Sequence, residues 1–314
     1  LGAAALSAAP MVQILSGEPS RTGFFATHKV PIGLQLYMLG DSVRTDLNGS
    51  FEKVARMGYR VLEAAGWHGH SPKLLHDAAA RHGLKCTSLH VPARSTDGGP
   101  QLDGDVGKLA ADARALGATD VVLSMFPVPL RLGVPRKDEA IPAYIARVAP
   151  QLTVDDWKRT AELLNAKGAA LKAQGLRLGY HNHNPEFAPV AGTTGLDVLL
   201  SETSPDSVVF ELDVGWALAS AVDPVALFQR HARRFQLMHV KDLRASTKPN
   251  FALRMDPAEI GAGVMNWNKV LSAAWTAGVR KYYVEQEPPF TLDRFEAANR
   301  SYRYLSTLGV TTTV

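Results

Sequence analysis

The feature of this chain that most constrains its fold is a regular alternation of short apolar runs with helical stretches that end at glycine. The clearest run is 208–213 (Val-Val-Phe-Glu-Leu-Asp), which is rich in β-branched and aromatic residues and is soon followed by Gly215. A run of this kind predicts a buried strand. The helical stretch 47–57 ends at Gly58, and others in the chain end in the same way. Repeated strand and helix units predict a parallel sheet.

We predict eight strands, each followed by a helix. The strands are 32–37, 59–63, 84–90, 119–124, 176–182, 208–213, 235–241 and 281–285. The helices are 47–57, 72–82, 106–116, 153–174, 195–201, 223–233, 266–277 and 292–308, and 127–150 is a proline-rich connection. Eight such pairs predict an α/β fold, a single (β/α)₈ TIM barrel. The alternative, an open doubly wound sheet, would carry a glycine-rich phosphate turn after its first strand, and 37–41 is no such turn.

Composition narrows the class of protein. With 46% hydrophobic residues, the 314-residue chain can bury a large core. Its 34 basic and 30 acidic residues are spread along the chain and form no basic stripe of the kind that binds nucleic acid. A single cysteine, Cys86, excludes an internal disulfide framework and a cysteine zinc site, and we expect it to be a buried core residue.

The first residues resemble the end of an export signal. Residues 1–9 are small and apolar, without the basic start of such a signal, and are too few to span a membrane. We therefore expect 1–26 to be the remnant of an export signal with a lead segment, and 27–314 to be the barrel domain. Export would make the protein periplasmic, and a cytoplasmic protein is the alternative.

Polar side chains recur where the predicted strands stop. Because alternate residues of a strand point the same way, these side chains form pairs at the carboxyl end of the barrel, where active sites of this fold lie. The pairs are His181 with His183, Glu211 with Asp213, His239 with Lys241, Glu285 with Glu287 and Gln35 with Tyr37, and Glu63 and His90 stand near their strand ends. Buried carboxylates repel one another unless a cation is present, and mixed imidazole and carboxylate ligands suit Mn²⁺, Zn²⁺, Co²⁺ or Fe²⁺.

At these motifs the chain resembles the sugar phosphate isomerase/epimerase group of xylose-isomerase-like barrels, to which inosose dehydratases and tagatose epimerase-like enzymes belong. The resemblance covers about residues 30 to 310. The matching stretches are 62–63, 88–92, 179–184, 211–216, 238–242 and 284–287. It implies one divalent metal, with Mn²⁺ the first choice, bound by ligands from strands five to eight.

Carried over by position, the implied metal ligands are Asp213, His239 and Glu285, with Glu287 as the competing choice for the last. The fifth-strand glutamate of the family has no counterpart here. His181 stands at its position, and Glu186 lies several residues beyond. We therefore expect His181 to complete the metal site.

The resemblance implies a divalent-metal-dependent sugar isomerase or epimerase that acts through an enediolate. Without the fifth-strand glutamate, an epimerase mechanism that uses two carboxylate bases on opposite faces of the substrate fits this chain less well. A carbon–oxygen lyase therefore stays open, either inosose dehydratase-like or acting by β-elimination on a keto-glycoside. A catalytically inert sugar-binding partner subunit also stays open, whereas dispersed charge argues against a DNA-repair endonuclease with this barrel.

Candidate roles follow from this chemistry. Glu285 would ligate the metal and act as base, and His183 or Glu63 would be a second acid/base. Lys241 would be an electrophile or hydroxyl ligand, or simply an ion-pair partner of Asp242 or Glu211. The predicted substrate-binding residues are His90, Trp216, Trp67 and Glu287; the tryptophans would stack on a sugar or pack against helices, and His90 would bind a hydroxyl or orient a ligand. The expected partner is a small carbohydrate, with no nucleic acid and no membrane span, and a homodimer is the assembly that we consider.

Overall fold

The computed structural model describes residues 23–95 and 98–309, so the predicted signal remnant at 1–9 lies outside the described residues. Its parallel strands close into a barrel in the order β1-β12-β9-β8-β5-β4-β3-β2. The strands are β1 (Gly33–Gln35), β2 (Val61–Ala65), β3 (Lys85–Val91), β4 (Asp120–Leu123), β5 (Arg177–His181), β8 (Val208–Asp213), β9 (Phe235–Val240) and β12 (Lys281–Val284). The predicted TIM barrel is therefore confirmed, with strand ends shifted by one or two residues.

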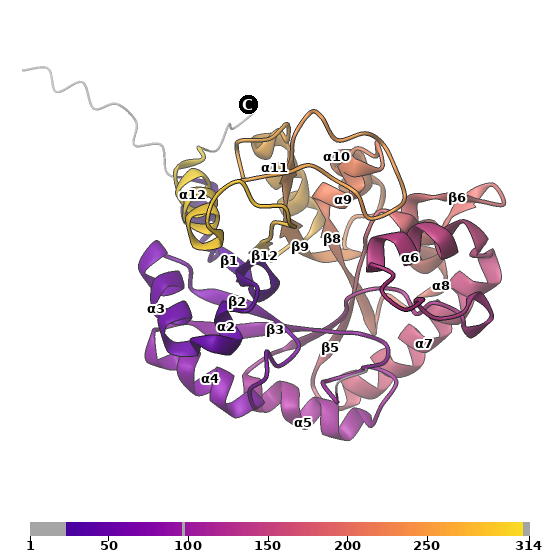
Figure 1. The fold of residues 1–314 in the computed structure, drawn as a ribbon, viewed down its shortest axis with the longest axis horizontal. Coiled ribbons are helices and arrows are strands. Elements are labelled where there is room, and N and C mark those ends of the chain that lie inside the picture. The colour runs from indigo at the N-terminus through magenta and orange to yellow at the C-terminus, as the bar shows by residue number, and fades with distance from the viewer. Residues whose placement is uncertain (1–22, 96–97, 310–314) are drawn as a thin grey trace, which may run out of the picture.

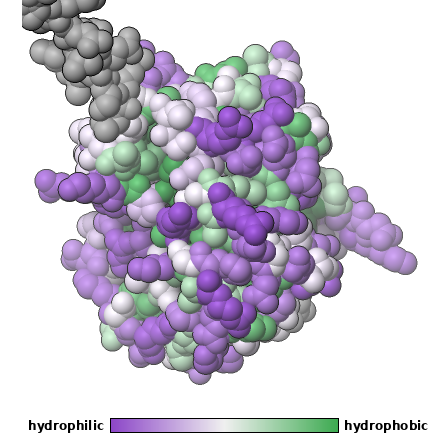
Figure 2. All heavy atoms as spheres, turned by 90° about the vertical axis from the view of Figure 1, so that its left-hand side faces the viewer, coloured by the Kyte–Doolittle hydropathy of each residue, from purple (hydrophilic) through white to green (hydrophobic). Residues whose placement is uncertain are grey.

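Helices form a ring around the strands (Figure 1). They are α3 (Leu47–Met57), α4 (Pro72–Arg81), α5 (Val106–Leu116), α7 (Val154–Ala173), α8 (Gly195–Glu202), α10 (Pro224–Arg230), α11 (Trp267–Ala277) and α12 (Arg294–Thr307). Thr153 and Asp156 begin α7 with a reciprocal capping box, and Gly58 ends α3 at a φ of 113°. On the side that carries α3 and α12, hydrophilic residues predominate, as expected for outward helix faces (Figure 2).

The structure adds short elements at the loops. They are α1 (Phe24–His28), η1 (Leu36–Leu39), α2 (Ser42–Thr45), η2 (Leu130–Leu132), α6 (Ile141–Val148), η3 (Ala149–Gln151), η4 (Pro185–Phe187), α9 (Val214–Ala219) and the hairpins β6 (Pro189–Val190) with β7 (Thr193–Thr194) and β10 (Asp242–Leu243) with β11 (Pro257–Ala258). The first strand was predicted too long. It stops at Gln35 because that side chain accepts a hydrogen bond from Tyr37 N (3.1 Å) and so begins η1. The connection 127–150 contains α6, whose first turn accommodates Pro142.

The amino-terminal end of the barrel is closed, which leaves the carboxyl end for a site. A buried layer of Val122, Val209, Leu237 and Tyr283 fills the barrel interior. At the strand starts, the buried carboxylate of Asp120 pairs with Arg177 (2.7 Å) and with Lys281. None of the helices in residues 23–95 and 98–309 is long and apolar enough to cross a lipid bilayer.

Candidate metal centre

Polar side chains from the carboxyl ends of the strands form a buried cluster beneath an open cavity of about 1150 Å³. The cavity is lined by His90, His181, His183, Trp216 and Glu287, among others. All of them lie at the carboxyl end of a strand or within three residues after it, so the predicted gathering of strand-end side chains is observed.

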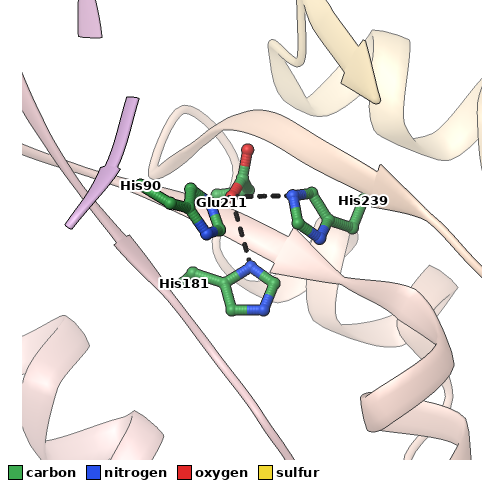
Figure 3. A group of neighbouring side chains, drawn as sticks. All are labelled: His90, His181, Glu211 and His239. Atoms are coloured by element: carbon green, nitrogen blue, oxygen red, sulfur yellow. Dashed lines mark hydrogen bonds and ion pairs between the residues drawn. The ribbon is translucent and has the colours of Figure 1, made fainter. Parts of the chain in front are cut away.

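Three imidazoles of the cluster meet at one carboxylate oxygen of Glu211 (Figure 3). Glu211 Oε2 lies 2.6 Å from His90 Nε2 and 3.2 Å from both His181 Nδ1 and His239 Nε2. One ligand atom from each of the four residues lies within 4.8 Å of the others, and all four residues are buried. Three imidazoles and a carboxylate in this arrangement are consistent with a divalent metal site.

A second group of potential ligands shares His239 with the first and uses the opposite nitrogen. His239 Nδ1 lies 3.0 Å from Glu285 Oε2 and 3.7 Å from Asp213 Oδ2. His181 Nε2 lies 3.8 Å from the same Asp213 oxygen. The four predicted metal ligands are thus brought together, with Glu285 rather than Glu287 beside Asp213 and His239.

Asp213 fits a metal ligand in its local geometry. It ends β8 and caps α9, because its Oδ1 accepts a hydrogen bond from Trp216 N (2.9 Å). Its Oδ2 is buried and lies 2.7 Å from the Lys241 ammonium, without a hydrogen bond of regular geometry from the described residues. A buried carboxylate oxygen in this condition is suited to a cation.

Lys241 supplies positive charge to the same oxygens. Its Nζ lies 2.7 Å from Asp213 Oδ2, 2.6 Å from Glu285 Oε2 and 3.3 Å from Glu287 Oε1. The ion pairs with Asp242 or Glu211 that we considered from the sequence are therefore wrong. Gly215 leaves room for the lysine stem, since a Cβ there would lie 2.7 Å from Lys241 Cγ.

The two groups differ in electrostatics. Burial favours the neutral form of Asp213 and Glu285, but Lys241 and His239 outweigh it and lower the pKa of both carboxyls. Glu211 lacks this lysine, and burial together with the charge of Glu63 raises its pKa to about 7. The lysine-paired carboxylates are therefore the ones held firmly ionised at neutral pH.

The pKa values of the histidines differ as well. Burial would lower the pKa of His239, but Glu211 and Glu285 overcome it and raise that pKa well above its usual value. Burial instead lowers the pKa of His183 to about 3, so its imidazole is neutral near pH 7. A neutral ring that faces a cavity can accept or donate one proton.

The remaining predicted residues fall into two sets. Glu63 is fully buried, and its Oε2 accepts hydrogen bonds from Gln35 Nε2 (2.8 Å) and His239 Nε2 (2.6 Å). It does not line the cavity, whereas Trp67 does. Trp216 both lines the cavity and packs against the core, because the residue is only 3% exposed.

Glu186 is the acidic residue of η4, a few residues beyond the end of β5. Its carboxylate is fully buried and accepts a hydrogen bond from the Tyr180 hydroxyl (2.8 Å). Burial raises the pKa of this carboxyl to about 7. Glu186 lies outside both groups of potential ligands, so it does not replace the fifth-strand glutamate that the family pattern would place in the site.

Sequence reasoning missed two features of the site. It paired Glu211 with Asp213 by strand period but considered Glu211 only as an ion-pair partner of Lys241, although three imidazoles contact its carboxylate. It also passed over His68, which lines the cavity from the loop after β2. Period-two spacing was the signal available for Glu211, whereas His68 lies beyond its strand and gave no such signal.

Comparisons with known proteins show which proteins the chain is similar to. A solved sugar phosphate isomerase/epimerase from Parabacteroides distasonis is 26% identical, has a TM-score of 0.69, and matches 95% of this chain and 98% of its own. An inosose dehydratase from Lacticaseibacillus casei is 34% identical over 30% of this chain and 31% of its own length. Another, from Geobacillus thermodenitrificans, is 26% identical over 50% of this chain and 56% of its own length.

The chain thus spans between about one third and about half of the length of these two curated relatives. The family description "Xylose isomerase-like TIM barrel" matches residues 51–306, which is most of the chain and includes both ligand groups. The chain belongs to the xylose isomerase-like TIM barrel family.

Proposed function

We propose that this protein is a divalent-metal-dependent enzyme that isomerises or epimerises a carbohydrate through an enediolate. The observation that carries the proposal is the buried group of Asp213, His239 and Glu285, with His181 beside it, beneath a large open cavity. A metal bound there would supply a Lewis acid that stabilises negative charge on a substrate oxygen. The identity of the metal is part of the proposal, with Mn²⁺ first and Zn²⁺, Co²⁺ or Fe²⁺ as alternatives.

In each of two histidines, one ring nitrogen faces the proposed metal ligands and the other faces a carboxylate that can hold the ring in place. His239 Nδ1 and His181 Nε2 face Asp213, whereas His239 Nε2 faces Glu63 (2.6 Å) and His181 Nδ1 faces Glu211 (3.2 Å). Carboxylates that accept the second N–H of a ligating histidine fix its tautomer and its orientation. We therefore assign Glu63 and Glu211 to positioning.

Two groups that line the cavity are suited to moving a proton. His183 has a neutral ring, and because burial lowers its pKa to about 3, it can take up a proton only after negative charge on a bound substrate raises that pKa. Glu287 lies beside Lys241, and burial raises its pKa to about 6. A carboxyl with such a pKa can exchange a proton near neutral pH, so we assign acid/base roles to His183 and Glu287 in preference to Glu63. Glu285 stays a ligand, held by Lys241 and His239.

A carbon–oxygen lyase is the second candidate, and two observations favour it. His181 stands where the isomerases that the chain resembles carry a glutamate. The His183 imidazole and the Glu287 carboxylate, which line the cavity, make an asymmetric acid/base pair. The relatives from L. casei and G. thermodenitrificans are inosose dehydratases. Elimination from an inosose or a keto-glycoside needs one base and one acid, and it begins with the same proton removal.

The test is proton NMR in D₂O on the full chain supplied with metal, using a panel of ketoses, inososes and 3-keto-glycosides. Solvent deuterium at one substrate carbon supports proton removal next to a carbonyl, and the product distinguishes isomerase from lyase. Stoichiometric metal without exchange on any sugar would favour a sugar-binding partner subunit instead.

Matched variants connect this activity to the site. Asp213→Asn should lose both bound metal and exchange, because the amide removes a charged ligand. Glu186→Gln is the control, since it is equally buried near the site but outside both ligand groups. Metal content should be measured by elemental analysis, and retention of full metal in Asp213→Asn would contradict the ligand assignment.

A further inference from the structure

Three buried ring nitrogens of cavity-lining residues have no hydrogen-bond partner among the described residues. They are His183 Nδ1, Trp216 Nε1 and His68 Nε2. Buried polar atoms are usually satisfied, and these three belong to residues that line the cavity, so a turn of the ring would bring each nitrogen to a polar group of a bound ligand. Those of His183 and Trp216 lie near the predicted metal ligands, whereas His68 lies on the loop after β2.

His68 faces the others across the mouth of the barrel. It follows β2, and Trp216 follows β8. In the closed order of eight strands, β2 and β8 are four positions apart in either direction, so they stand on opposite sides. A ligand that contacts both His68 and the β8 side must therefore extend across the mouth.

The loop that carries His68 holds it in an uncommon conformation. His68 has a φ of 49°, between Gly66 at 67° and Gly69 at 78°. A non-glycine residue in this region is disfavoured, and such conformations concentrate at functional sites. His70 fastens the loop, because its Nε2 lies 3.0 Å from the Val43 carbonyl oxygen. The protein thus keeps a disfavoured backbone at a residue whose ring nitrogen is unsatisfied.

The neighbour of His68 offers a complementary surface. Trp67 lines the same cavity, and a sugar ring presents an apolar face to an aromatic ring and hydroxyls to a hydrogen-bonding group. The cavity volume of about 1150 Å³ exceeds the range of about 300–1,000 Å³ that is usual for pockets of drug-sized ligands. There is room for a second ring beyond the one that reaches the metal ligands.

We propose that Trp67 and His68 form an outer subsite that binds the second ring of a glycoside, with His68 as a specificity-determining residue. The proposal rests on the proposed function only in that the first ring is taken to lie over Asp213 and His239. The substrate class is therefore a two-ring glycoside rather than a free monosaccharide.

The experiment is isothermal titration of the full, metal-supplied chain with glucose, maltose and cellobiose, which probe one ring and two rings without turnover. We expect at least one disaccharide to bind about tenfold more tightly than glucose. His68→Gly suits the positive φ. It should weaken the binding of that disaccharide about fivefold to tenfold, which is the order of one hydrogen bond, and leave the binding of glucose unchanged.

His68→Asn tolerates the same backbone and keeps a polar group, so it should retain part of the preference. His76→Gln, on the exposed surface of α4, is the control and should change nothing. Equal affinities for glucose and both disaccharides, or an equal loss for all three sugars in His68→Gly, would overturn the subsite. Disaccharide preference without deuterium exchange would count against the proposed function and leave the subsite standing.

Discussion

His239 is the residue through which the two ligand groups are joined. Its Nδ1 lies 3.0 Å from Glu285 Oε2, and its Nε2 lies 2.6 Å from Glu63 Oε2 and 3.2 Å from Glu211 Oε2. Both nitrogens are therefore engaged, and the fully buried ring cannot turn without breaking a contact. Replacement of His239 would disturb metal ligation and the positions of Glu63 and Glu211 together.

A pH prediction belongs to His68. Burial, with a smaller contribution from His70, lowers its pKa from 6.5 to about 4. Between these values the unfolded chain binds a proton at His68 that the folded chain does not, so this residue's contribution to stability falls as the pH drops from 6.5 towards 4. The difference in unfolding free energy between the parent and His68→Asn should change by about 1.4 kcal/mol per pH unit in that window.

Urea unfolding of both proteins at several pH values, from just above the folded pKa to about one unit above the unfolded pKa, would measure this difference. Ionisations shared by the parent and the variant cancel in it. A difference that does not vary with pH would show that His68 titrates alike in both states.

At the scale of elements, Asp242 fixes the long segment after β9. Its carboxylate is fully buried and accepts hydrogen bonds from four N–H groups: Leu243 N (2.9 Å), Gly261 N (3.0 Å), Met265 N (3.1 Å) and Trp267 Nε1 (2.9 Å). The segment between these contacts brings Leu253 and Met255 to the cavity. The sequence could not predict this role of Asp242, because most of its hydrogen-bond partners lie some twenty residues further along the chain.

Asp242→Ala should destabilise the protein by at least about 3 kcal/mol, because it leaves several buried N–H groups without an acceptor. Hydrogen exchange should rise in 244–265, and sugar affinity should fall. Asp256→Ala is the matched control on the same segment, since the Asp256 side chain is half-exposed and its carboxylate contacts Arg244 and the Ser246 hydroxyl near the surface rather than buried N–H groups. Equal protection of 244–265 in the parent and in Asp242→Ala would contradict this role.

At the scale of the whole molecule, the alternation of apolar runs and glycine-ended helices was enough to predict the barrel. Strand period also predicted that His181, Asp213, His239 and Glu285 would meet at one end. It could not predict the contacts across the barrel, such as Glu63 with His239, because those distances depend on how eight strands close. Export and a homodimer remain predictions.

Metal removal gives a test at this scale. Lys241 and His239 together balance the charge of Asp213 and Glu285, so treatment of the parent with a chelator should leave it folded, with only a small loss of stability. In Lys241→Met the same carboxylates would be buried without this partner, and the metal-free variant should be less stable by about 3–5 kcal/mol. Added Mn²⁺ should recover most of that loss.

Urea midpoints with and without chelator, for the parent and for Lys241→Met, would measure both effects. The methionine keeps most of the length of the lysine stem that passes Gly215, so its effect reports mainly on the charge. Unfolding of the parent on chelation, as happens in small zinc domains, would contradict the role of Lys241.

The ammonium between Asp213 and Glu285 also bears on how the protein matures. A chain that carries its own counter-charge can reach its final shape before it meets an ion, so folding and metal acquisition become separate events in its biogenesis. The ion that it receives would then be decided by the supply in the compartment where the finished barrel resides.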